Sequence, residues 1–179
     1  SSRLTEVVDG ILTLTRMDQM RYQVVPVEMG IREYIEDQIE RLEGLAYRKK
    51  IKLEFLPGDE HKIISDVMLL GRAFSNVTSN CIRYAKEMVW ISVEENGEQL
   101  KITIRDDGPG ILEDDLPHLF DRFYKGKNGN HGLGLSIAKR SMEYMVCDIA
   151  AQASPEGAIF TIILPQDCRS FAVEEWTEV

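Results

Sequence analysis

The sequence predicts an α+β sandwich, in which helices cover one face of a single sheet. Three observations lead to this fold class: apolar residues recur with helical spacing in several segments, other segments alternate like strands, and the two kinds do not follow a strict strand–helix alternation. A length of 179 residues is sufficient for one such domain with a short appendage.

The composition excludes several classes of protein. Hydrophobic residues make up 44% of the chain and charged residues 28%, which is typical of a globular protein and not of a disordered one. A net charge of −9 argues against general nucleic-acid binding, because that activity needs a basic surface. The sequence has neither an apolar run of about 20 residues, as a membrane span requires, nor a secretory leader. Three widely spaced cysteines without a C-x-x-C pair fit a reducing cytosol and predict neither a disulfide nor a zinc site.

The beginning of the chain carries an apolar stripe that predicts a helix over residues 2–17. The stripe consists of Leu4, Val7, Val8, Ile11 and Leu14. One helix cannot bury this stripe alone, so it needs a partner. Packing on the main domain and packing in a coiled coil or helix bundle are both compatible with the pattern.

The next predicted elements are a strand, a helix and a strand. Residues 22–27 read as a short strand, which its proline places at a sheet edge. Residues 31–45 carry apolar side chains at positions i, i+4, i+8, i+11 and i+14, the pattern of an amphipathic helix. Residues 51–56 alternate like a strand and stop at Pro57-Gly58.

A third long helix is predicted over residues 67–81, where apolar side chains mark one face. A hairpin follows, with strands over residues 90–94 and 100–105. These strands lie around Asn96-Gly97, the strongest short signal for a hairpin turn.

The last predicted elements are a loop, a helix and a pair of strands. Residues 112–132 are polar and contain glycine, which predicts a long loop. A helix is predicted over residues 135–145, and residues 149–153 and 158–164 are expected to close the sheet.

Two glycine-containing segments flank this loop. Residues 106–110 (Asp-Asp-Gly-Pro-Gly) follow a predicted strand, and residues 129–135 (Gly-Asn-His-Gly-Leu-Gly-Leu) lead into a predicted helix. Glycine lets the backbone approach a ligand closely, and a helix N-terminus offers free N–H groups to an anion. A carboxylate beside one loop and a helix start beside the other suggest a nucleotide site.

The third helix carries an unusual polar stripe. Asn76, Asn80 and Arg83 are spaced at i, i+4 and i+7, and Tyr84 lies between this stripe and the apolar face. One interpretation is a solvated outer face. The other is that the amide oxygens hold a hard cation such as Mg²⁺, while Arg83 meets phosphate and the Tyr84 ring lies against a base.

Together these residues resemble the catalytic and ATP-binding region of bacterial sensor histidine kinases, members of the GHKL superfamily. Four boxes carry the resemblance in the family order: residues 76–84 resemble the N box, 106–111 the G1 box, 119–125 the F box and 132–138 the G2 box. The resemblance covers about residues 22–165. It implies the Bergerat (GHKL) ATP-binding fold, a two-layer α/β sandwich with a mixed sheet and helices on one face, preceded by a helix of the dimerisation domain.

The resemblance also implies a role for individual residues. Asp106 would accept a hydrogen bond from the adenine amino group, and Tyr84 would pack on the base. Asn80 would bind Mg²⁺, with Asn76 supporting the ion directly or through water. The other residues implied at ATP are Arg83, Gly108, Gly110, Ile111, Arg122, Lys125, Gly132, Leu133, Gly134 and Leu135.

The family reaction implied by the resemblance moves the γ-phosphoryl group of ATP to a histidine of the dimerisation domain, and then to an aspartate of a response regulator. Residues 1–21 would be the end of a dimerisation helix, residues 22–165 the catalytic domain and residues 166–179 a C-terminal extension. The acceptor histidine is expected before Ser1. The expected partners are ATP, the protein's own dimerisation domain in a homodimer and a response-regulator receiver domain, with no nucleic acid. The domain is expected to be cytoplasmic, in a parent protein anchored in the bacterial inner membrane.

Departures from the family pattern leave two alternatives open. Arg83 replaces the usual lysine, and Val146-Cys147 replaces the usual Gly-Gly turn. Both suggest a non-catalytic pseudokinase that binds nucleotide as one alternative. The second is a GHKL-type ATPase, but such enzymes have a glutamate as the general base where this chain has Asn76, an amide without useful basicity.

Overall fold

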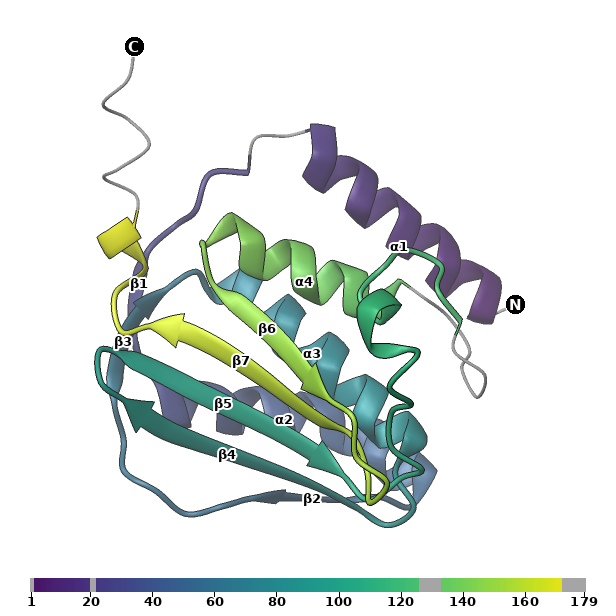
Figure 1. Cartoon of the computed structure of the whole chain (residues 1–179). Coiled ribbons are helices and arrows are strands. Elements are labelled where there is room, and N and C mark those ends of the chain that lie inside the picture. Colours follow the sequence, from purple (N-terminus) through teal and green to yellow (C-terminus); the bar gives the residue numbers. More distant parts are fainter. Residues whose placement is uncertain (1, 20–21, 126–132, 172–179) are drawn as a thin grey trace.

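The computed structural model describes residues 2–19, 22–125 and 133–171. The main sheet contains β2 (Lys52–Phe55), β4 (Met88–Asn96), β5 (Gln99–Asp106), β6 (Asp148–Gln152) and β7 (Ile159–Pro165), and the helices that cover it are α2 (Ile31–Lys49), α3 (Val67–Tyr84) and α4 (Gly134–Tyr144). The strand order is β2-β4-β5-β7-β6. Strand β2 runs parallel to β4, and the other neighbours are antiparallel. The three helices lie on one face of this sheet (Figure 1), which confirms the predicted α+β sandwich with a mixed sheet.

The alternation of side chains along strand β5 determines which way Asp106 faces. Its inward-facing residues Leu100, Ile102 and Ile104 are fully buried in the core. Because successive side chains alternate between the two faces of a sheet, Asp106 at the end of β5 also faces inward. The main core thus continues directly into a buried carboxylate.

The hairpin between β4 and β5 confirms the predicted turn. Asn96 pairs with Gln99, so Gly97 and Glu98 form the loop. Gly97 has a φ of 65° and stands in open space. A glycine adopts this backbone conformation without strain.

The segment before β1 corrects one prediction. Residues 22–26 are not a strand, because β1 covers Val27–Gly30 and pairs antiparallel with β3 (Lys62–Ser65). The sequence had given no sign of β3. In place of a strand partner, the Val25 N–H donates to the Asp66 side chain, and Pro26 has no N–H to give.

Asp66 ties this segment to the start of α3. Its Oδ1 accepts hydrogen bonds from the N–H groups of Met68 and Leu69, at 2.9 Å and 3.0 Å, and so caps the helix. Its Oδ2 accepts from Val25 N at 2.8 Å and from the Tyr22 hydroxyl at 3.1 Å. One buried carboxylate therefore fixes both a helix end and the incoming chain.

Replacing Asp66 is expected to separate these two contributions. The Asp66→Ala variant loses the cap and the tether and should lower the free energy of unfolding by about 2 kcal/mol. The Asp66→Asn variant keeps an oxygen for the cap and should lose about half as much. Urea unfolding followed by circular dichroism measures both values, and an Asp66→Asn variant as stable as the parent would show that the tether to Tyr22 and Val25 contributes nothing.

Helix α4 ends in a turn that glycine would normally make. Val146 has a φ of 54°, in the left-handed region that a β-branched residue avoids. The chain thus forms the turn without the Gly-Gly pair of the family, with Val146 largely exposed.

Helix α1 (Ser2–Gln19) packs on the domain through one edge only. Leu14 and Met17 are buried, and Leu14 forms a separate apolar cluster with Leu133 and Ile137 of the α4 region. The opposite edge exposes Leu4, Val8, Ile11 and Leu12. The apolar stripe was compatible with packing on the main domain and with packing in a coiled coil or helix bundle. The structure shows packing on the main domain for one edge of α1, and bundle packing of the exposed edge stays a prediction.

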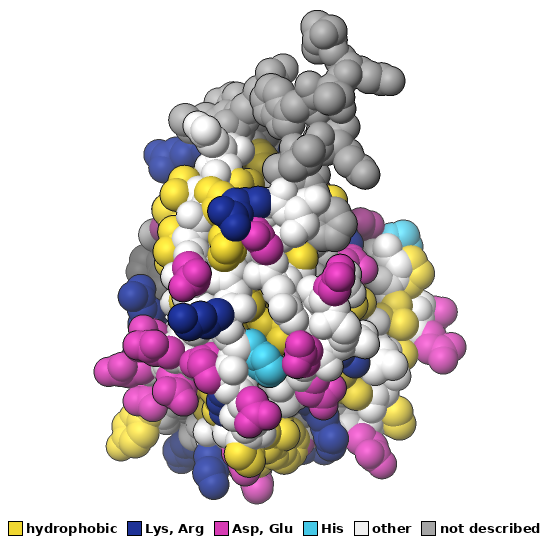
Figure 2. Space-filling model, turned by 90° about the vertical axis from the view of Figure 1, so that its left-hand side faces the viewer, with side chains coloured by type: hydrophobic (Ala, Val, Ile, Leu, Met, Phe, Trp, Pro, Cys, Tyr) yellow, Lys and Arg dark blue, Asp and Glu magenta, His cyan; other side chains and the backbone are white. Residues whose placement is uncertain are grey.

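The described surface shows two further features. On the face drawn in Figure 2, acidic and basic side chains are interspersed. Within the described ranges, no helix is both long enough and apolar enough to cross a membrane.

Candidate nucleotide site

The polar stripe of α3 lines a cavity of about 450 Å³ between α1, α3 and the start of α4. On α3 the opposite face is buried in the core, so the stripe is the side that remains accessible. The described residues that line the cavity are Glu6, Val7, Asp9, Gly10 and Thr13 of α1, Leu45 of α2, Asn76, Ser79, Asn80 and Arg83 of α3, and Leu133, Gly134, Leu135 and Ile137 at α4. The structure thus brings the predicted Asn76, Asn80 and Arg83 together with residues of the G2 box.

The two amides of the stripe line this cavity, and the orientation of Asn76 is fixed. The Asn76 Nδ2 group donates to the Arg72 carbonyl at 2.8 Å, which fixes the amide and directs its oxygen elsewhere. A Cβ atom on Gly134 would lie 3.2 Å from Asn76 Oδ1, so that oxygen faces the start of α4. Asn80, one turn further along, is half-buried and lines the same cavity. Amide oxygens in this position are suitable ligands for a hard cation.

The start of α4 is open toward the cavity. The residue before the helix, Leu133, provides no side-chain cap. The first N–H groups of a helix have no partner within the helix, and they attract anions together with the helix dipole. Gly134 and Leu135 lie at this helix start, whereas Gly132 is outside the described residues.

Asp106 forms the second part of the site. Its Oδ1 accepts hydrogen bonds from Gly108 N at 2.8 Å and from Ala158 N at 3.2 Å. Its Oδ2 is buried and accepts no hydrogen bond from any described residue, while the buried thiol of Cys81 lies beside the carboxyl group. Burial raises the pKa of Asp106 above its ordinary value of 3.8, and the two N–H donors work against this effect. The carboxylate therefore keeps one acceptor for a ligand.

The glycines beside Asp106 make room for close backbone packing. A Cβ on Gly108 would lie 2.3 Å from the Tyr84 carbonyl oxygen, and one on Gly110 would lie 1.7 Å from the Ser154 carbonyl oxygen. Gly110 also has a φ of 80°, which favours glycine. These contacts bring the end of α3 and the loop before β7 against the G1 box.

Sequence reasoning missed two contributions to this arrangement. The loop before β7 supplies the Ala158 N–H to Asp106, and a Cβ on Gly157 would lie only 1.8 Å from the Asp106 carbonyl oxygen. The second contribution is Asp107, whose carboxylate accepts the N–H groups of Lys86, Glu87 and Met88. Although burial works in the opposite direction, these donors hold the pKa of Asp107 below its ordinary value.

The two parts of the site are connected through α3. Asp106 is not among the described residues that line the cavity. However, Cys81 beside Asp106 follows directly after Asn80, and the Tyr84 carbonyl lies against Gly108. Half-buried Tyr84 stands between the cavity side and the Asp106 side of the helix. Ile111, after the G1 box, is half-buried against the core.

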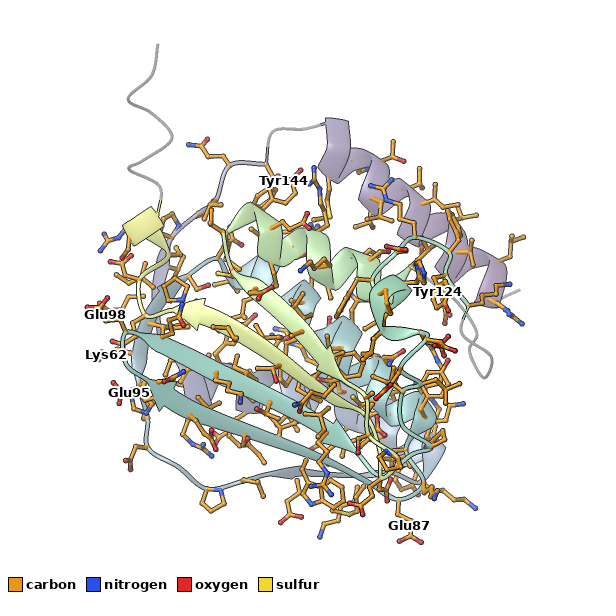
Figure 3. All side chains as sticks on the ribbon, in the orientation of Figure 1. Lys62, Glu87, Glu95, Glu98, Tyr124 and Tyr144 are labelled. Atoms are coloured by element: carbon orange, nitrogen blue, oxygen red, sulfur yellow. The ribbon has the colours of Figure 1, made fainter. Side chains whose placement is uncertain are left out.

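The F-box segment contributes no described residue to the cavity lining. Tyr124, labelled in Figure 3, donates a hydrogen bond from its hydroxyl to Asp115 Oδ1 at 2.6 Å. This bond connects the end of the F box to the loop that precedes it. Arg122 and Lys125 are exposed. A phosphate role for these two residues stays a prediction.

Residues 65–167 match the family model described as histidine kinase-, DNA gyrase B- and HSP90-like ATPase. The signal transduction histidine-protein kinase AfsQ2 of Streptomyces coelicolor is 33% identical over 171 residues, which cover 92% of this chain and 31% of AfsQ2.

Solved structures share the fold. Full-length ShkA in complex with AMPPNP matches with a TM-score of 0.79 at 21% identity, over 90% of this chain and 35% of ShkA. The histidine kinase ThkA in complex with the response regulator protein TrrA matches with a TM-score of 0.82 at 17% identity, over 94% of this chain and 49% of that one.

The chain spans about a third of the length of the curated relatives it matches. The family model alone covers more than half of the chain and includes β5, α3, α4 and both parts of the site. The chain therefore belongs to the family of histidine kinase-, DNA gyrase B- and HSP90-like ATPases.

Proposed function

We propose that this chain is the ATP-binding catalytic domain of a sensor histidine kinase, which transfers the γ-phosphoryl group of ATP to a histidine. One arrangement carries the proposal: Asn76 and Asn80 of α3 line one cavity with the start of α4, which Asn76 Oδ1 faces, and the unpaired oxygen of Asp106 lies beside the next turn of α3. Membership of the family supports it, as does the identity to AfsQ2.

The Asp106 end of the site is suited to adenine. A buried carboxylate oxygen without a donor needs one, because an unmade buried hydrogen bond costs about 1–3 kcal/mol. The exocyclic amino group of adenine supplies such a donor, whereas the carbonyl of guanine at that position would be repelled. Gly108 and Gly110 keep this wall free of side chains, and the Tyr84 ring would lie against the base.

The α3 stripe and the α4 start are suited to the phosphate groups and Mg²⁺. Asn80 would hold the ion, and Asn76, whose oxygen already faces Gly134, would support it. When bound, Mg²⁺ neutralises charge on the phosphates. The N–H groups at the start of α4 and the Arg83 guanidinium would bind phosphate oxygens, with Arg122, Lys125 and Gly132 as further candidates from the loop.

The residues of the site favour transfer to a delivered nucleophile over hydrolysis. Asn76 occupies the position from which a general base would act on water, and an amide cannot take a proton there. The acceptor histidine would come from the dimerisation domain of a homodimer, and a response-regulator aspartate would receive the group next. In this proposal residues 1–21 belong to that dimerisation domain, residues 22–165 to the catalytic domain and residues 166–179 to an extension, and the parent protein is anchored in a membrane.

Calorimetric titration of the chain with ADP and with AMPPNP, in the presence and absence of Mg²⁺, tests the binding part of the proposal. We expect adenine nucleotides to bind, Mg²⁺ to strengthen the binding, and GDP to bind far more weakly. The absence of measurable adenine nucleotide binding, both by the parent chain and by variants of α1, would overturn the proposed function.

The metal role of Asn80 makes a separate prediction. The Asn80→Ala variant should weaken AMPPNP binding about tenfold or more in the presence of Mg²⁺ and change it little without the ion, because only the ligand oxygen is lost. Asn96→Ala, at the exposed end of β4, is the matched control and should leave both affinities unchanged. Equal weakening with and without Mg²⁺ would contradict a metal role.

A reaction assay separates the proposal from its alternatives. The chain is mixed with radiolabelled ATP and a separately produced dimerisation domain of a similar kinase. Phosphoryl transfer to that domain supports the kinase, steady phosphate release supports an ATPase, and nucleotide binding without either supports a pseudokinase.

A further inference from the structure

Helix α1 forms one wall of the cavity that the proposed function assigns to the phosphate groups. Five of the described lining residues belong to it, and the amides of α3 line the same cavity. Figure 1 shows α1 above α4, and the two helices are in contact. Access to the phosphate end of the site therefore depends on where α1 lies.

The contacts that hold α1 in this docked position are few and can be identified. Gly10 is a close approach point, because a Cβ on it would lie 3.0 Å from Leu133 Cδ1. Leu14 packs on Leu133 and Ile137. At the other end, the hydroxyl of Tyr144, labelled in Figure 3, donates to the Met17 carbonyl. The far edge of α1 exposes large apolar side chains.

The charge of the α1 wall is unfavourable for phosphate. Glu6 and Asp9 are three residues apart and share one helix face, and both line the cavity. Arg83 is the cationic residue in the described lining, so the carboxylates outnumber it by two to one. A nucleoside triphosphate with Mg²⁺ is itself an anion, so carboxylates that line the same cavity repel it.

We infer that α1 in its docked position inhibits nucleotide binding, because the carboxylates of Glu6 and Asp9 oppose the phosphate groups in the shared cavity. This inference rests on the proposed function of the site. Docking of α1 then lowers the affinity for nucleotide, and bound nucleotide lowers the equilibrium constant for docking of α1 by the same factor, as linkage between two equilibria requires. Movement of α1 is thereby a means of regulating the occupancy of the site.

Removing the charge without changing the shape tests the electrostatic part. In the full chain, the double variant Glu6→Gln with Asp9→Asn should bind AMPPNP about threefold to tenfold more tightly than the parent at low ionic strength. At about 0.5 M salt the ratio of the two affinities should fall toward one. Glu36→Gln with Asp37→Asn makes the same change of net charge on the exposed part of α2 and should leave binding unchanged. Weaker binding by the α1 variant would overturn the inference, since the carboxylates would then be ligands of the metal.

Displacing α1 tests the positional part. Gly10→Val places side-chain atoms against Leu133 and should release the helix, which tightens AMPPNP binding and speeds amide hydrogen exchange along α1. Gly44→Val in α2 introduces the same residue at an exposed helical position with only the far end of Arg48 nearby, and should do neither.

The reciprocal measurement uses the unaltered chain. Saturation with AMPPNP and Mg²⁺ should raise the exchange rate of the α1 amides while protecting those of α3. Unchanged or slower exchange in α1 would overturn the inference. If the parent chain binds nucleotide but none of the α1 variants changes its affinity, only this inference fails. If neither the parent nor any variant binds nucleotide, the proposed function fails as well.

Discussion

Replacing Asp106 by asparagine is expected to abolish adenine nucleotide binding in practice, with an affinity loss of about a hundredfold or more. The reason is the fixed pair of backbone donors, Gly108 N and Ala158 N, that point at Oδ1. An asparagine must turn its oxygen toward these donors, which leaves its NH₂ group where Oδ2 was. That group would then meet the amino group of adenine, donor against donor.

The same variant is expected to be more stable than the parent chain. Asp106 is fully buried and leaves Oδ2 unpaired, so its charge is costly at neutral pH. Because folding raises the pKa of this carboxyl, its favourable contribution is present below the ordinary value of 3.8 and is lost as the pH rises through the folded value. Asp106→Asn should therefore raise the free energy of unfolding at pH 7 by about 1 kcal/mol, with a smaller gain at acid pH.

The neighbouring aspartate provides the control with the opposite sign. Asp107 accepts three backbone N–H groups and has a lowered pKa, so its contribution is present above the ordinary value and is lost as the pH falls through the folded value. Asp107→Asn should therefore destabilise the protein at pH 7. Calorimetric titration and urea unfolding at several pH values measure both variants. An Asp106→Asn protein that still binds ADP, or that is less stable at pH 7, would show that Asp106 is a structural residue.

The opposite behaviour of these adjacent aspartates illustrates what sequence alone can establish. The glycines and Asp106 were identified from a pattern within a few residues, and strand period explains why Asp106 faces inward. The partners that define its chemistry come from elsewhere. Ala158 and Gly157 lie about fifty positions further along, in a loop with no pattern of its own.

The errors in the predicted secondary structure also come from contacts between residues that are distant in the sequence. Long segments with repeated periods, such as α2, α3 and the β4–β5 hairpin, were predicted correctly because many residues report the same period. Strand β3 has only four residues, and β1 begins where the prediction ended it. Both depend on pairing with each other, which no local pattern reveals. Likewise, the stripe of α1 predicted a buried face but could not tell which surface would cover it.

Replacing Gly157 by alanine is expected to cause the largest loss of stability of any substitution considered, about 3 kcal/mol or more. The new Cβ would lie 1.8 Å from the Asp106 carbonyl oxygen, and both atoms are held by backbone. The φ of 132° is also unfavourable for any residue with a side chain. The loop must therefore move away from β5, which withdraws the Ala158 N–H from Asp106 and should weaken nucleotide binding at the same time.

Gly97→Ala separates the clash from the cost of a positive φ. Gly97 has a φ of 65°, but a Cβ on it would meet no atom within 4 Å, so its replacement should cost only the left-handed backbone penalty of about 1 kcal/mol. Both substitutions reduce the freedom of the unfolded chain alike, so that contribution cancels when their unfolding free energies are compared. The remaining difference measures how firmly the loop before β7 is held against Asp106. If the two variants lose equal stability, the loop yields easily, and the position of the Asp106 carboxylate must then be set by Gly108 alone.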